Sequence, residues 1–207
     1  MSTSKPASPV TISADEALQR LIDGNNRFRS GQVTYTGLHL EALKALAEGQ
    51  SPFATIVGCS DSRVPVELVF DAGLGDLFVI RVAGNVFSPE VAGSLQYAGA
   101  ILHTPLFIVM GHEGCGAVKA ALNSREKVDI IYPRIQLLVD RIVPGLPKYD
   151  PQLSSTELLA QAVESNVRWT VQQILDTPEG RARVAEGRMK IVGAIYEIAS
   201  GRVNFLP

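Results

Sequence analysis

The sequence has few of the features that mark secreted, membrane-spanning or nucleic-acid-binding proteins. Only two cysteines, Cys59 and Cys115, occur among 207 residues, which excludes a disulfide framework of the secreted kind. There is no run of 18 apolar residues, and the first 18 residues contain one lysine and no apolar stretch long enough for a signal peptide. We therefore expect a cytoplasmic protein with no membrane partner.

An excess of charge of one sign is also missing. The 19 basic and 21 acidic side chains give a formal net charge of −2, whereas nucleic-acid binders normally carry a basic excess or stripe. No nucleic-acid partner is expected. With 46% hydrophobic and 19% charged residues, the composition is that of an ordinary globular protein. A chain of this length buries a sufficient core in one domain, so we predict a single domain over 1–207, with 1–12 flexible.

Short apolar runs predict the strands. The segments FATIVG (53–58), LFVIRV (77–82) and LFIVMG (106–111) are rich in β-branched and aromatic residues and are followed by glycine or turn residues, as in buried parallel strands. Near the end, KIVGAIYE (190–197) and RVNFL (202–206) flank a Ser-Gly turn, which predicts a strand followed by an edge strand.

Helix-start signals separate these runs. Capping patterns at Ser13 and Ser154, and Ser-Pro at 88–89, precede apolar residues at helical spacing. They predict helices ending near Gly31, Leu175 and Leu102, and apolar stripes predict two more over 38–47 and 130–143. The fold class is α/β, with a mainly parallel four-stranded sheet flanked by helices and an extra C-terminal edge strand. Residues 13–48 form an N-terminal helical arm with no obvious place in the core, so we expect this arm to pack on a second subunit.

Two polar clusters follow predicted strands. The segment from Cys59 to Arg63 follows the first strand, and the segment from His112 to Gly116 follows the third. In an open parallel sheet, ligands bind beyond the carboxyl ends of the strands. If the two strands are neighbours, two thiolates and an imidazole converge on one tetrahedral ion, and such ligands select zinc.

Other interpretations of the two cysteines are buried structural thiols or a reversible Cys59–Cys115 disulfide. Zinc is favoured because both cysteines lie in strand-end clusters, and Cys115 stands three residues after His112 with glycine on each side. Three protein ligands leave an open position, as in catalytic zinc sites. The candidates for that position are water, Asp61, and the two other histidines, His39 and His103.

Asp61 and Arg63 suggest a switch. The carboxylate of Asp61 can either bind zinc or pair with the Arg63 guanidinium through two hydrogen bonds. When Arg63 holds Asp61, the ion is free to bind water and generate hydroxide at neutral pH. The alternative is a strand-end cap with a surface ion pair.

At these positions the sequence resembles the β-class carbonic anhydrases. The segments CSDSRVP (59–65) and HEGCGAV (112–118) are similar to the two metal-binding signatures of that family, and the likeness extends from GNNRF (24–28) through RVAGNV (81–86) to YEIASGRV (196–203). The resemblance implies hydration of CO2 to bicarbonate by a zinc-bound hydroxide, in a homodimer or a dimer of dimers. The implied zinc ligands are Cys59, His112 and Cys115, with Asp61 as optional fourth ligand and Arg63 as its catalytic partner.

The resemblance also implies a substrate pocket. Gln50, Phe78 and Tyr97 match pocket-lining positions, partly supplied by the partner subunit, and the Gly116 N–H matches a substrate-orienting donor. Taken alone, Phe78 and Tyr97 are ordinary packing residues and Gln50 is a loop residue. Ile56 stands where members with an inhibitory bicarbonate site have tryptophan, so inhibition through that site is not expected.

Two other functions remain open at this point. Hydrolysis of CS2 or COS would use the same scaffold and ligands, and a non-catalytic zinc-stabilised module would keep Asp61 on the ion at every pH.

Overall fold

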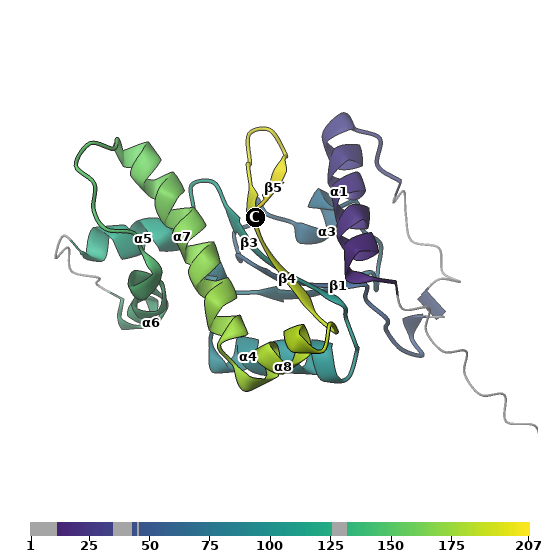
Figure 1. Cartoon of the computed structure of the whole chain (residues 1–207). Coiled ribbons are helices and arrows are strands. Elements are labelled where there is room, and N and C mark those ends of the chain that lie inside the picture. Colours follow the sequence, from purple (N-terminus) through teal and green to yellow (C-terminus); the bar gives the residue numbers. More distant parts are fainter. Residues whose placement is uncertain (1–11, 35–42, 45, 126–131) are drawn as a thin grey trace, which may run out of the picture.

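The structure is a computed structural model that describes residues 12–34, 43–44, 46–125 and 132–207. Its centre is a sheet in the order β2-β1-β3-β4-β5 (Figure 1). The strands are β1 (Ala54–Gly58), β2 (Leu77–Arg81), β3 (Leu106–His112), β4 (Lys190–Tyr196) and β5 (Val203–Phe205). The first four are parallel and β5 runs antiparallel to β4, which confirms the predicted fold class.

Helices cover both faces of this sheet. They are α1 (Ala14–Ser30), α3 (Val66–Val69), α4 (Pro89–Ala100), α5 (Gly116–Ser124), α6 (Pro133–Ile142), α7 (Ser155–Leu175) and α8 (Pro178–Ala185), with short 3-10 turns η1 (Ala83–Asn85) and η2 (Val143–Gly145). The predicted caps at Ser13, Ser88 and Ser154 all accept backbone hydrogen bonds. No helix in the described ranges is long and apolar enough to cross a membrane.

Three short helices, α3, α5 and α8, were not predicted. The start of α8 did carry a signal, because Thr177 accepts the N–H of Gly180 and Pro178 occupies the first helical position. Helix α5 begins inside the second polar cluster, directly after Cys115. The glycines around Cys115 predict a turn between ligands, and this pattern masks the helix that starts at Gly116.

Alternating side chains of the central strands divide the core between the two faces. Ile56, Ile108 and Met110 belong to a buried cluster with residues of α1 and α3. Val57, Phe107 and Val109 belong to another, with residues of α4 and α7. This alternation follows from the two-residue period of a strand, and burial of both faces explains why the strands are nearly continuous apolar runs.

The N-terminal arm has a place in the core of its own chain, contrary to expectation. In α1, Ala17 and Leu21 are 0% exposed and share a buried cluster with Val69 and Phe70. The apolar stripe of α1 is therefore covered by α3 and the sheet, which sequence periodicity does not reveal. Residues 35–42 and 45, which carry most of the second predicted helix, lie outside the described residues, as do 1–11 and 126–131; a dimerisation role for the arm stays a prediction.

The chain order reverses between the two central strands. From β1, the chain continues to β2 on one side, and β3 then pairs with β1 on the other side. A crevice beyond the carboxyl ends of strands at such a switch point is the usual ligand site of open α/β sheets. Both polar clusters identified in the sequence follow β1 and β3.

Candidate metal centre

Three potential metal ligands converge beyond the ends of β1 and β3. Cys59 directly follows β1, His112 is the last residue of β3, and Cys115 is the N-cap of α5. Their ligand atoms all lie within 4.8 Å of one another. The three side chains are buried, at 4%, 0% and 1% exposure. The neighbouring-strand condition on which the sequence argument depended is met by the β1–β3 pairing.

The His112 ring is oriented as a ligand. Its Nδ1 lies 2.9 Å from the backbone oxygen of Glu113, a contact that requires Nδ1 to donate and leaves Nε2 with a free lone pair. Within the described part of the chain, the buried Nε2 has no hydrogen-bond partner. Since buried polar atoms are rarely left unpaired, this orphaned nitrogen fits a metal ion.

The two thiols also fit a divalent cation. Interaction with Cys115 is the main cause that lowers the pKa of Cys59. Interaction with Cys59, followed by burial, raises the pKa of Cys115, and the N–H groups of Val118 and Ala117 at the start of α5 offset this only in part. One thiolate therefore forms readily and opposes formation of the second. A bound cation supplies the positive charge that lets both sulfurs ionise.

Local backbone geometry explains how His112 and Cys115 face one point. Gly114 has a φ of 66°, a left-handed conformation that glycine adopts without steric cost. The turn leads directly from β3 into α5, so Cys115 lies at the helix start. Gly116 is the first residue of α5 and is exposed, and the N–H groups of a first helical turn have no partner within the helix.

Asp61 and Arg63 form the predicted pair. Arg63 Nε lies 3.0 Å from Asp61 Oδ1 and Nη2 lies 2.8 Å from Oδ2, while the Arg63 backbone N–H donates to Oδ1 at 2.9 Å. The hydrogen bonds from Arg63 hold the pKa of Asp61 well below its usual range. Asp61 Oδ2 is 3.8 Å from His112 Nε2. The carboxylate therefore borders the three ligand atoms while it is paired with Arg63.

The other predicted pocket residues lie elsewhere in the same chain. Phe78 pairs in register with Thr55, four residues before Cys59, which places its backbone roughly 13 Å from the metal cluster at about 3.3 Å per residue. Its ring lies 6.1 Å from that of Tyr97 on α4. Gln50 precedes β1 and is exposed. One subunit thus brings Asp61, Arg63 and Gly116 to the ligands, but not Gln50, Phe78 or Tyr97.

The structure bears on the other interpretations of the cysteines and histidines. Both thiols are free in this structure, which is the reduced state that metal binding requires. His103 is exposed and precedes β3, at the opposite end of the strand from His112, so it is not a ligand of this cluster. His39 lies outside the described residues.

Sequence reasoning missed the residues that support the ligand loop. Arg81 donates from Nε to the Cys59 oxygen at 3.0 Å and from Nη2 to the Asp61 oxygen at 2.7 Å. The backbone N–H of Gly84 donates to Cys59 Sγ at 3.3 Å. Both belong to the segment RVAGNV (81–86), which carries part of the family likeness but no motif that indicates contact with the ligand loop.

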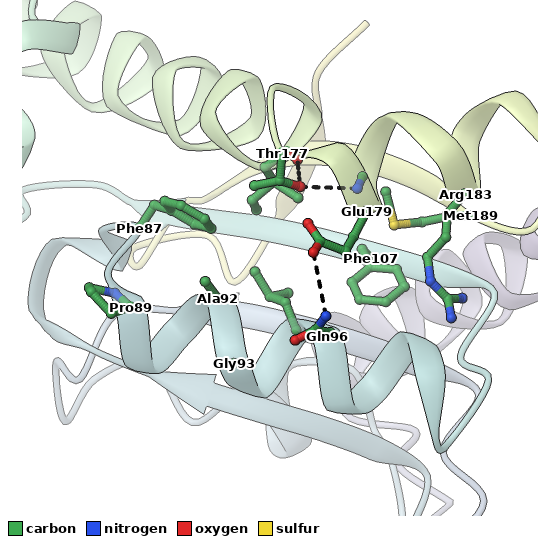
Figure 2. Close-up of a pocket in the computed structure, with 13 residues that line it drawn as sticks. Phe87, Pro89, Ala92, Gly93, Gln96, Phe107, Thr177, Glu179, Arg183 and Met189 are labelled. Carbon is green, nitrogen blue, oxygen red and sulfur yellow. Dashed lines mark hydrogen bonds between the residues drawn. The ribbon is translucent and has the colours of Figure 1, made fainter.

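A separate cavity of about 310 Å³ lies between α4 and α8 (Figure 2). Phe87, Phe107 and Met189 contribute to its apolar wall, and Gln96 and Glu179 approach each other across it at 3.5 Å. None of the predicted site residues lines it. The ligands Cys59, His112 and Cys115 are also absent from its lining, so this cavity is distinct from the metal centre.

Comparison with known proteins gives a consistent result. A family model described as carbonic anhydrase matches residues 54–203. A carbonic anhydrase from Mycolicibacterium smegmatis is 37% identical over 196 residues, which cover 91% of this chain and 91% of that protein. The β-carbonic anhydrase CcaA matches with a TM-score of 0.72 at 29% identity, over 92% of this chain and 95% of its own. A tetrameric β-carbonic anhydrase from Sordaria macrospora shares the fold, with a TM-score of 0.74 at 23% identity over 92% of this chain and 97% of its own.

Proposed function

The chain belongs to the β-carbonic anhydrase family, and on that premise we propose that Cys59, His112 and Cys115 hold the zinc ion with which it interconverts CO2 and bicarbonate. The observation that carries the assignment is the convergence of two buried sulfurs and the orphaned His112 Nε2 within 4.8 Å. Zinc with three such protein ligands lowers the pKa of a water molecule at its open position to about 7, which supplies a nucleophile at neutral pH.

In the proposal, Asp61 controls and orients the open position. Its low pKa keeps it ionised at neutral pH, so it only accepts hydrogen bonds. Held by Arg63, its carboxylate stays off the metal and is available to accept an O–H from the attacking group. That contact would direct a lone pair of the nucleophile toward the carbon of CO2, which lowers the entropic part of the barrier.

Gly116 is proposed to stabilise the negative charge that develops on the substrate. Gly116 is exposed and its N–H belongs to the first turn of α5, where unpaired donors and the positive end of the helix dipole favour an anion. An oxygen of CO2 gains charge as bicarbonate forms, so a donor at this place acts more strongly on the transition state than on the substrate. The proton released by the reaction leaves to buffer.

A second copy of the chain is proposed to complete the substrate pocket with Gln50, Phe78 and Tyr97. Strand β2 is an edge of the described sheet, with one row of backbone groups open to another chain. On the neighbouring helix α4, Tyr97 is 46% exposed, and Ile101 directly after this helix is 61% exposed, so these two side chains form an uncovered apolar surface. The Sordaria protein is tetrameric, and we propose a homodimer, or a dimer of dimers, for this chain.

Mixed dimers test this arrangement. Arg63→Ala removes a residue beside the metal, and Tyr97→Ala removes one proposed to reach the partner's site; each alone should lose roughly 100-fold in activity. In a heterodimer of the two variants, one site contains both changes and the other contains neither. About half of the wild-type activity should therefore return in co-expressed, doubly tagged heterodimers. If no activity returns, the pocket is not shared between subunits.

The function itself is tested with Cys59→Ser. We expect loss of bound zinc and of CO2 hydration together, measured by metal analysis and stopped flow. Ser60→Ala is the matched control, because Ser60 is the exposed neighbour of the ligand and its loss should leave both quantities unchanged. Full activity in a zinc-free Cys59→Ser protein would refute the proposed mechanism. A wild-type protein that holds zinc but does not hydrate CO2 would instead be a CS2 or COS hydrolase or a non-catalytic zinc module, and assays with CS2 and COS distinguish these two.

A further inference from the structure

A buried hydrogen-bond network connects α7 to the turn η1, which contacts the sulfur of Cys59. Asn166 Nδ2 donates to the Gly84 oxygen at 2.8 Å, and Thr170 Oγ1 donates to the Asn85 oxygen at 3.2 Å. Asn166 and Thr170 are four residues apart on α7, a spacing that puts both on one helix face. Both side chains are almost fully buried, at 1% and 0% exposure. The helix thus holds two successive peptide groups of η1.

The turn has a backbone conformation that needs support. Gly84 has a φ of 72° and Asn85, which is not a glycine, has a φ of 44°. Left-handed conformations of non-glycine residues persist where the surrounding structure holds them. Besides the bonds from α7, the Asn85 N–H donates to the Val82 oxygen at 2.9 Å. Together these bonds fix the peptide planes on both sides of Asn85.

The turn is also wedged by its neighbours. A Cβ added to Gly84 would lie 2.8 Å from Ile142 Cδ1 and 3.1 Å from Ala117 Cβ. A side chain at Gly84 would therefore displace Ile142 and Ala117, and the turn sits directly against α6 and against the start of α5, which carries Cys115 as its N-cap. Its position fixes the Gly84 N–H, which donates to Cys59 Sγ at 3.3 Å.

Asn166 is a poor choice for stability alone. Its Oδ1 is buried and has no hydrogen-bond partner among the residues that the structure describes. An unpaired buried acceptor opposes folding, which offsets part of the stabilisation from the hydrogen bond that Nδ2 donates to the Gly84 oxygen. The hydrogen bond from Asn166 Nδ2, which fixes the position of the Gly84 oxygen, better explains why an amide stands here.

We propose that Asn166 and Thr170 are positioning residues, which hold the η1 turn so that the Gly84 N–H donates to the metal-binding sulfur of Cys59. The inference rests on the proposed zinc function. A hydrogen bond to a metal thiolate withdraws negative charge from the sulfur, and outer-shell contacts of this kind tune the metal and orient its ligand. Weakening it leaves more charge on the sulfur, makes the ion a weaker Lewis acid, and moves the pH midpoint of activity upward.

The experiment uses the full-length protein with Thr170→Val and Asn166→Leu, each close in shape to the residue it replaces. Zinc transfer to a coloured chelator should become roughly 10- to 100-fold faster in both variants. In protein reconstituted with Co²⁺, the thiolate-to-cobalt charge-transfer band should move to lower energy, since the sulfur is more electron-rich. Thr170→Ser keeps the hydroxyl and should restore wild-type behaviour in both measurements.

Two control variants separate positioning from general destabilisation. Thr104→Val removes a buried hydroxyl that donates to the Ala98 oxygen, and Asn25→Leu removes a buried amide with three hydrogen bonds. Both lie away from the metal centre, so they should destabilise the fold but leave the cobalt band unchanged. The inference is overturned if Thr170→Val and Asn166→Leu give the wild-type band, or if the controls shift it equally. If wild-type protein binds no zinc, the proposed function fails instead.

Discussion

Arg63 holds both carboxylate oxygens of Asp61, through Nε at 3.0 Å and Nη2 at 2.8 Å. The carboxylate is still close to the metal ligands, since Oδ2 lies 3.8 Å from His112 Nε2. A modest side-chain rotation would therefore carry Asp61 from the guanidinium to an ion held by Cys59, His112 and Cys115. The fourth position of the ion is therefore open to water while Arg63 binds Asp61, and it is closed when Asp61 binds the ion.

Arg63→Ala should block the fourth zinc position without loss of the zinc ion. Freed from Arg63, Asp61 is expected to bind zinc and displace water, so CO2 hydration at pH 7 should fall by roughly 100-fold while zinc content stays unchanged. Stopped-flow assays and metal analysis on the same preparation measure both. Arg168→Ala, which removes an exposed ion pair with Glu164, is the control and should be silent. Wild-type activity in Arg63→Ala would contradict the switch.

Zinc retention should weaken on acidification because of His112. Burial lowers the pKa of His112, but the neighbouring Cys59 and the Glu113 carbonyl outweigh it and raise the pKa above its usual 6.5 in the metal-free site. Below that pKa the ring is protonated and cannot bind zinc, so zinc affinity should be greatest above it and fall as the pH drops through it. Asp61 does not produce this transition, since its pKa is lowered.

Chelator competition between pH 5 and 8 measures this dependence directly. Since zinc binds the folded protein, the midpoint of thermal unfolding should follow zinc occupancy and fall when a chelator is added at neutral pH. The raised pKa of Cys115 makes the affinity pH-dependent over this whole range, so His112 is identified by a steeper fall below its own pKa. An affinity that does not steepen there would show that His112 is not a ligand.

Arg81→Met should loosen the ligand loop. The change removes the hydrogen bonds to the Cys59 and Asp61 carbonyl groups but keeps an unbranched side chain on β2. Zinc affinity should fall roughly 10-fold, the lower end of effects seen for outer-shell residues, with a parallel loss of activity. Equilibrium dialysis against zinc buffers gives the affinity, and Arg202→Met serves as a control at an exposed arginine.

Leu21→Ala should destabilise the chain itself. Leu21 is 0% exposed in the cluster that joins α1 to Phe70 and the sheet, so its loss should cost about 2–5 kcal/mol. Urea unfolding measures the cost. Leu68→Ala, at a 59% exposed leucine of α3, should change stability by less than about 0.5 kcal/mol. Equal effects of the two changes would mean that α1 is not anchored in the core of its own chain.

The sequence located most of the fold because its signals are local. The runs at 53–58, 77–82 and 106–111 match β1, β2 and β3 to within one residue at each end, since parallel strands buried on both faces must be apolar throughout. Capping residues likewise located α1, α4 and α7. Helix α5 escaped because the glycines around Cys115 allow a turn as readily as a helix start.

The sequence by itself determined the donor set: two cysteines and a histidine follow two predicted parallel strands, and such ligands select zinc if those strands are neighbours. That β1 and β3 are neighbours was decided by the tertiary structure. The tertiary structure decided the rest. It paired Asp61 with Arg63 and packed α1 into the core of the same chain. It also placed the Gly84 N–H within hydrogen-bond distance of Cys59 Sγ, in a turn that α7 holds through Asn166. These contacts depend on the rotamer of one side chain or on residues as much as 82 positions apart, and neither periodicity nor motif spacing encodes such geometry.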